Sequence, residues 1–160
     1  MLATPSLPIT ATWAPLFAGY SFYLMSRVVR SRMGAKVSLG DGTVEELSCL
    51  QKDETDQAKI AKYKTLRIAM RAQSNYLENV PIALFLIAVL EANRASPKAI
   101  HGLLGTLFAA RVLHANFGMF WNATGMGKGR FYGFMTTNAV IIVSSVWNGV
   151  IGSQVLRGQL

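Results

Sequence analysis

The sequence has little charge and almost no cysteine, and each shortage excludes a class of protein. Only 15% of its 160 residues are charged while 51% are hydrophobic, which is too apolar for a typical water-soluble domain. The single cysteine, Cys49, cannot form an internal disulfide. No cysteines and histidines share metal-ligand spacing, so we expect no metal site. The length allows about four membrane crossings of roughly 20 residues each.

Acidic residues are scarce outside one segment. The formal net charge is +8, from 16 Lys and Arg against 8 Asp and Glu. Residues 32–64 hold six bases and six acids, so the rest of the chain has ten bases and only two acids, Glu78 and Glu91. In a soluble protein this excess would suggest nucleic acid as a partner. Here the bases flank or interrupt apolar runs, so we expect a membrane and no nucleic acid.

Four long apolar segments predict an all-α integral membrane four-helix bundle. The expected spans cover about residues 9–29, 65–92, 98–120 and 131–155, with a soluble insertion at about 33–64. The N-terminus lacks the basic region of a signal peptide, so we expect a retained first span. Arg and Lys gather in the first and third connections, which the positive-inside rule places in the cytoplasm.

The second span carries charged side chains, which are costly in a membrane unless they face a bundle interior or water. Arg67, Arg71, Asn75 and Glu78 lie at offsets of 0, 4, 8 and 11 residues, which keeps them within an arc of about 60° on a helix. Arg71 and Glu78 could merely neutralise each other. Such pairs usually lie four residues apart, however, and two arginines outnumber the one acid.

The third and fourth spans add three candidate residues. Arg111 and His114 lie three residues apart and share a helix face, beside which we expect Gly118 to leave space. Arg130 begins the fourth span. Taken alone, His114 and Arg130 could each be ordinary interfacial residues, whereas Arg111 lies deeper in its span.

The ligand that these residues suit is a small zwitterion with several carboxylates. Guanidinium groups on neighbouring helices bind carboxylates, and Glu78 could receive an ammonium group. Glutathione fits this description, and a nearby guanidinium would raise its thiolate fraction. The residues permit glutathione without singling it out.

A longer pattern in the second span resembles a family signature. Residues 71–81, Arg-Ala-Gln-Ser-Asn-Tyr-Leu-Glu-Asn-Val-Pro, are similar to the R-A-(Q/H)-x-N-x-x-E-x-x-P signature of the MAPEG family, the membrane-associated proteins of eicosanoid and glutathione metabolism. Gly40-Asp41-Gly42, the Arg111 and His114 pair, and Gly129-Arg130 resemble bacterial-type members. The resemblance covers about residues 10–155 apart from the segment around 44–62. The members that the sequence is similar to include microsomal glutathione transferase and leukotriene C synthase.

The resemblance implies a left-handed bundle of four membrane helices, assembled as a homotrimer, that binds glutathione between subunits near the cytoplasmic side. Arg71, Asn75 and Glu78 would hold glutathione, and Gln73 would contact it from a neighbouring subunit. From their charge and position, Arg67 and Arg111 are added to this set of cofactor-binding candidates.

The resemblance also implies catalytic residues. Arg130 aligns with the arginine that stabilises the thiolate in leukotriene C synthase. Arg30 or Arg32 corresponds to arginines at the end of the first helix, near the cofactor. His114 is a further candidate, as a general acid or base.

The predicted function is a glutathione-dependent transferase, peroxidase or isomerase that acts on a lipophilic electrophile from the membrane. Many members of the family have tyrosine at the positions of Asn79, His114 and Gly118. The tyrosine at the position of His114 contacts glutathione in those members. Two alternatives therefore stay open: a non-catalytic lipid-binding scaffold, and a specialised-pathway isomerase or cyclase that uses the same cavity without glutathione turnover. The expected location is the endoplasmic reticulum in a eukaryote or the inner membrane in a bacterium.

Overall fold

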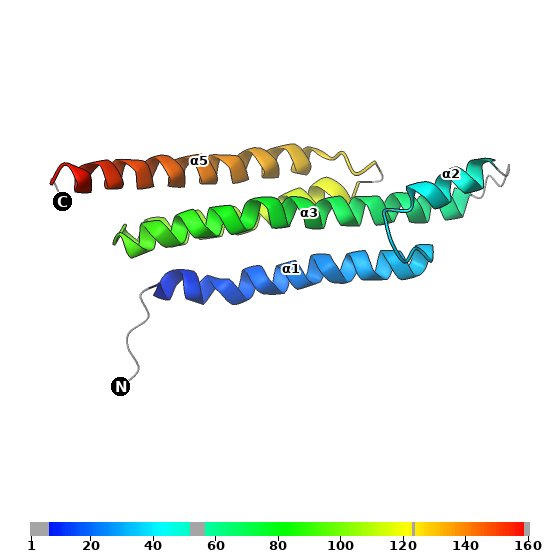
Figure 1. Cartoon of the computed structure of the whole chain (residues 1–160), viewed down its shortest axis with the longest axis horizontal. Helices are drawn as coiled ribbons and strands as arrows, with labels where there is room; N and C mark the ends of the chain where they lie inside the picture. The colour runs from blue at the N-terminus through cyan, green and yellow to red at the C-terminus, as the bar shows by residue number, and fades with distance from the viewer. Residues whose placement is uncertain (1–6, 52–56, 123, 159–160) are drawn as a thin grey trace, which may run out of the picture. The chain divides into compact units, whose positions relative to one another are not determined.

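The structure, a computed structural model, describes residues 7–51, 57–122 and 124–158, and nearly all of them are helical (Figure 1). The helices are α1 (Pro8–Ala35), α2 (Thr43–Gln51), α3 (Gln57–Ala92), α4 (Pro97–Val112), the π-helix η1 (Leu113–Phe120) that continues α4, and α5 (Lys128–Leu156). No strand occurs in these ranges. The all-α prediction is confirmed.

Three helical segments are long and apolar enough to cross a membrane, namely Gln57–Ala92, Pro97–Phe120 and Lys128–Leu156. At 1.5 Å per residue, the 36 residues of α3 extend about 54 Å, which exceeds the roughly 30 Å of a bilayer's hydrocarbon core. The helix also continues through Pro81. One end of α3 therefore projects out of the membrane.

The first predicted span and the predicted soluble insertion remain predictions. The 28 residues of α1 are long enough to cross a membrane. However, α1 is not among the three described segments that are both long and apolar enough to do so. The predicted insertion contains α2 and the first turns of α3, and its residues 52–56 lie outside the described ranges.

The chain forms two compact parts, which we describe separately. The first part contains the residues up to Ala18 and from Leu77 onward, and the second contains Gly19–Tyr76. Both α1 and α3 contribute to each part. The signature in α3 is divided by this boundary, with Arg71 before it and Glu78 after it.

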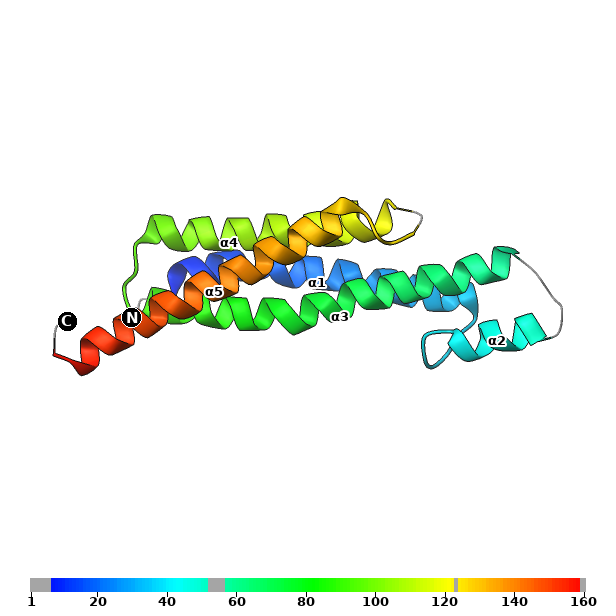
Figure 2. The ribbon, with the colours of Figure 1, turned by 90° about the horizontal axis from the view of Figure 1, so that it is seen from above.

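In the first part, α5 packs against α4 and η1 (Figure 2). Fully buried aliphatic side chains fill its core, among them Leu104 and Leu107. The beginning of α1 is fixed by Glu91, whose carboxylate accepts hydrogen bonds from the backbone N–H groups of Ile9 (2.6 Å) and Thr10 (2.8 Å). Glu91 thus caps donors that a helix start leaves unpaired, which gives the acid a structural role.

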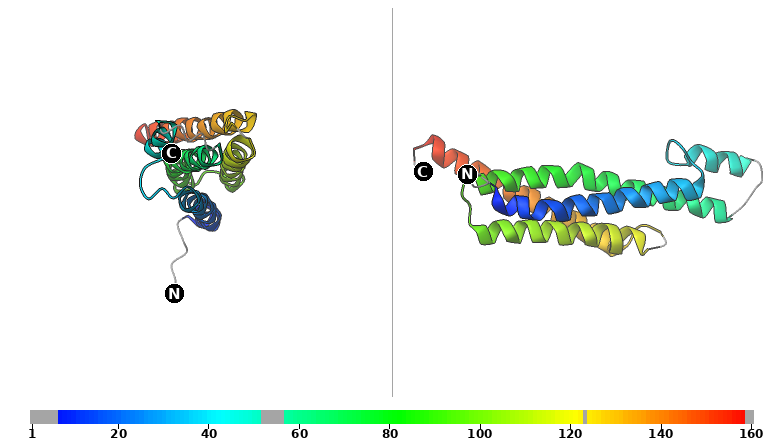
Figure 3. Two further views of the ribbon diagram at one scale, coloured as in Figure 1. Left: turned by 90° about the vertical axis from the view of Figure 1, so that its right-hand side faces the viewer. Right: turned by 90° about the horizontal axis from the view of Figure 1, so that it is seen from below.

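In the second part, α2 lies along the N-terminal turns of α3 (Figure 3). Glu46 of α2 forms an ion pair with Arg67 of α3, with 2.5 Å between Oε2 and Nη1. Leu24 of α1 and Leu66 of α3 are buried. This part therefore combines an apolar α1–α3 core with a polar attachment for α2.

Three glycines allow η1 and α5 to approach more closely than side chains would permit. A Cβ atom on Gly118 would overlap the backbone nitrogen of Arg130, and one on Gly133 would lie 2.5 Å from the carbonyl oxygen of Ala110. On Gly129 it would lie 2.8 Å from the carbonyl oxygen of Leu113. The expectation that Gly118 leaves space is wrong, because the backbone of α5 occupies that space.

We predict that Gly133→Ala destabilises the protein, whereas Gly149→Ala does not. The new methyl group at residue 133 would overlap Ala110 and His114, at a cost of about 1–3 kcal/mol. At residue 149, also in α5, it would meet open space, and alanine is the better helix former. Thermal unfolding in detergent should show a lower midpoint for Gly133→Ala only. Equal midpoints would contradict the close packing.

Candidate functional site

The signature residues lie along the outside of α3 in the isolated chain. Arg71 and Glu78 are exposed, while Gln73 and Asn75 are half-buried. The positions between them that turn inward are apolar or aromatic and buried, namely Ala72, Tyr76 and Val80. The chain's own core therefore does not cover the two charged residues of the signature.

A cavity of about 240 Å³ lies beside the first signature residue. It is lined by Asp41, Arg67, Met70, Arg71 and Ser74. The structure thus brings Arg67 and Arg71 together as predicted, but the two arginines differ in their pairing. Arg67 is bound to Glu46, whereas Arg71 makes no hydrogen bond or ion pair with another described residue. The positive charge available to a ligand in this cavity is that of Arg71.

Asp41 is a site residue that the sequence reasoning missed. Its carboxylate accepts hydrogen bonds from the hydroxyl and the backbone N–H of Thr43, which hold the pKa of Asp41 below its ordinary value. Gly42 fixes the turn, because it has φ +83° and a Cβ there would lie only 2.9 Å from the Tyr63 ring. The Gly-Asp-Gly triplet was the available signal, but it indicated only a turn.

Arg111 is buried inside the first part. It is 1% exposed, and its Nη1 donates to the hydroxyl of Thr137 in α5 at 3.3 Å. That hydroxyl in turn donates to the carbonyl oxygen of Gly133 at 2.8 Å. Arg111 therefore links α4 to α5 in this structure, and its contact with a cofactor stays a prediction.

His114 is buried and fixes the backbone at the beginning of α5. Its Nδ1 lies 2.9 Å from the carbonyl oxygen of Arg130. Because a carbonyl oxygen only accepts, Nδ1 must be the protonated nitrogen of this ring. The geometry gives His114 a positioning contact with Arg130, while its role as an acid or base stays a prediction.

The half-buried guanidinium of Arg130 contacts neutral groups of the preceding turn. Its Nη1 donates to the carbonyl oxygen of Gly125 at 3.4 Å and lies 3.2 Å from the sulfur of Met126. No carboxylate in the described residues pairs with it. Its positive charge is consequently not neutralised by the described parts of the chain.

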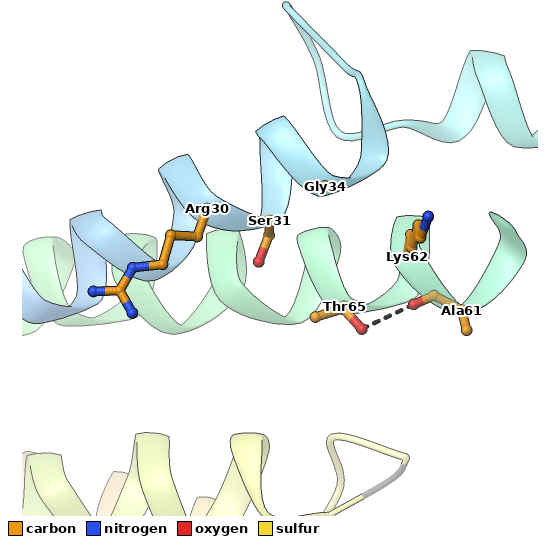
Figure 4. Close-up of a pocket in the computed structure, with 6 residues that line it drawn as sticks. All are labelled: Arg30, Ser31, Gly34, Ala61, Lys62 and Thr65. Carbon is orange, nitrogen blue, oxygen red and sulfur yellow. Dashed lines mark hydrogen bonds between the residues drawn. The ribbon is translucent and has the colours of Figure 1, made fainter. Parts of the chain in front are cut away.

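The structure distinguishes the two arginines proposed at the end of α1. Arg32 donates to the carbonyl oxygen of Ser38 at 3.3 Å and contacts the sulfur of Met70, which lines the Arg71 cavity. Arg30 instead lines a separate groove of about 350 Å³ between α1 and α3 (Figure 4). Arg32 therefore has the closer connection to the signature.

Comparison with known families matches residues 10–150 to the MAPEG family. No curated protein and no solved structure matches the chain. Within the described residues, no group of three metal-binding side chains lies together.

We predict that Glu46→Gln loosens α2, whereas Glu45→Gln does not. Glu46 holds α2 to Arg67, and pairs that are this exposed contribute up to about 1 kcal/mol, or roughly a fivefold change in an opening equilibrium. Hydrogen exchange across α2 should accelerate about two- to fivefold in Glu46→Gln only. Unchanged exchange in that variant would show that the ion pair does not hold α2.

Proposed function

The chain belongs to the MAPEG family, and on that premise we propose that it is a membrane enzyme that uses bound glutathione to attack lipophilic electrophiles. The family consists of integral membrane helical bundles and is related to glutathione chemistry. The observation that carries the proposal is the outward-facing signature of α3, where Arg71 and Glu78 are both exposed.

Charged side chains on the outside of a long apolar helix need a polar environment. Facing hydrocarbon, each would cost several kcal/mol on the scales for membrane insertion, about 2.5–3.5 kcal/mol for Arg. A second subunit together with a charged ligand provides that environment. We therefore take the working form to be the homotrimer, with glutathione between adjacent subunits.

The Arg71 cavity suits one end of a zwitterionic peptide. The guanidinium of Arg71 is available for a bidentate bond to a carboxylate, and the carboxylate of Asp41 lines the same cavity. Arg67 is already held by Glu46, so its proposed role is to keep the cavity in shape. Glu78 receives the glutathione ammonium group, and Asn75 and a neighbouring subunit's Gln73 bind its peptide backbone.

Arg130 supplies the charge for the chemical step. A thiol has an unperturbed pKa of about 8.5, so a nearby guanidinium increases the fraction of thiolate at neutral pH. The backbone of Arg130 is held by His114, and among the described residues its guanidinium contacts only neutral groups that a thiolate can displace. The thiolate then attacks a lipophilic electrophile that arrives through the bilayer; conjugation, peroxide reduction and isomerisation share this first step.

We predict that glutathione forms a thiolate on the protein and that Arg130→Ala abolishes it. Adding glutathione to detergent-solubilised protein should increase thiolate ultraviolet absorbance in the wild type. Lys128→Gln, which removes an exposed charge from the same turn, should retain the signal. If the wild type gives no signal, or Arg130→Ala gives an unchanged one, the proposed mechanism is wrong.

Mixed subunits should restore binding if one glutathione site uses two chains. Arg71→Ala removes the carboxylate partner, and Gln73→Glu places a negative charge against anionic glutathione, so each variant alone should bind weakly. Coexpressed in equal amounts, they should form an intact site at about one quarter of the subunit interfaces. Glutathione titration measures how much binding the mixed subunits recover. If they recover no binding, both residues belong to the same subunit's site.

A further inference from the structure

A groove outside the signature cavity lies between the end of α1 and the first turns of α3 (Figure 4). Its volume is about 350 Å³, and its lining residues are Arg30, Ser31, Gly34, Ala61, Lys62 and Thr65. Gly34 of α1 and Ala61 of α3 add little side-chain bulk to the lining. The groove is therefore large enough for a small polar group and is bordered by cations.

A second hollow of about 270 Å³ adjoins this groove through Gly34 and Lys62. It adds Lys36 and Lys59 to the lining, and none of the described residues that line either hollow is acidic. Within the described ranges, Arg30, Lys36 and Lys62 form no hydrogen bond or ion pair through their side chains. Other bases of α1 are engaged, since Arg27 donates to the hydroxyl of Tyr23. Arg30 and Lys62 thus line the groove and Lys36 lines the adjoining hollow, and the described chain does not compensate their charges.

The predicted first span places these cations at the surface of a membrane. From Pro8 to Ser26 the helix has no charged residue, and Arg27 is the first. At 1.5 Å per residue, Arg30 lies about 4.5 Å and Gly34 about 10 Å beyond it along the helix axis. The headgroup layer on each side of a bilayer is roughly 5–8 Å thick. The groove therefore covers the depth at which lipid phosphates lie.

We infer that this groove, the α1–α3 groove, binds the phosphate of an anionic membrane lipid. Lysine ammonium groups are strong, compact partners for phosphate, and Ser31 adds a hydroxyl on the α1 side of the groove. Anionic lipids are concentrated at the cytoplasmic surface, where basic residues near the membrane attract them. The site differs from the proposed glutathione site, because Lys36 and Lys62 belong to neither the signature nor its cavity.

The test compares a lysine variant with a matched control in uncharged detergent. Phosphatidylglycerol, phosphatidylcholine or sodium phosphate is titrated into each protein. Native mass spectrometry measures the retained lipid, and thermal denaturation measures the unfolding temperature. The variant is Lys36→Gln/Lys62→Gln; the control is Lys98→Gln/Arg157→Gln, which removes two exposed charges elsewhere. Each basic side chain near an anionic surface contributes about fivefold in affinity, so the lysine variant should bind phosphatidylglycerol at least about tenfold more weakly.

The wild type and control should retain phosphatidylglycerol in preference to phosphatidylcholine, with affinities within about twofold of each other. The inference is overturned if the wild type shows no such preference, or if the control loses as much affinity as the lysine variant. Competition by sodium phosphate at the lipid's own concentration would also overturn it, in favour of a soluble anion. The glutathione thiolate signal should persist in the lysine variant, so this inference can fail without the proposed function failing.

Discussion

The arrangement of this protein depends on the cost of placing charge on the surface of a membrane helix. In α3, Ala72, Tyr76 and Val80 turn inward and are buried, which leaves Arg71 and Glu78 on the exposed side. In a helix that is apolar enough to span, any such residue that faces hydrocarbon incurs a large penalty. The proposed trimer and its bound zwitterion would both meet this constraint.

Arg111 shows how the same chain encloses a charge within the fold. Its side chain is 1% exposed, is bonded to Thr137 and lies where the glycines bring η1 and α5 into close contact. Arg71 has no comparable partner in the part of the chain that the structure describes. The contrast between an arginine enclosed by the fold and one left available is the physical basis for assigning ligand binding to α3.

The helices and the signature could be predicted from the sequence because both are local patterns. Apolar length predicts the three segments that are long and apolar enough to span, and helical spacing places Arg71 and Glu78 on one side of one helix. Contacts between distant segments could not be predicted in this way. Nothing in the spacing of Gly118 and Gly133 indicates that the α5 backbone fills the space beside them, and the pairing of Arg67 with Glu46 depends on how α2 folds back. Asp41 joins the Arg71 cavity only because its turn packs against Tyr63.

The central claim is that the exposed charges of α3 are completed by neighbouring subunits and glutathione together. Native mass spectrometry of the protein, purified in a mild detergent with glutathione present, measures the number of subunits and the bound glutathione at once. The account predicts a trimer that carries up to three glutathione molecules, one for each subunit interface. A monomer that binds glutathione unaided, or a trimer that binds none, would contradict it.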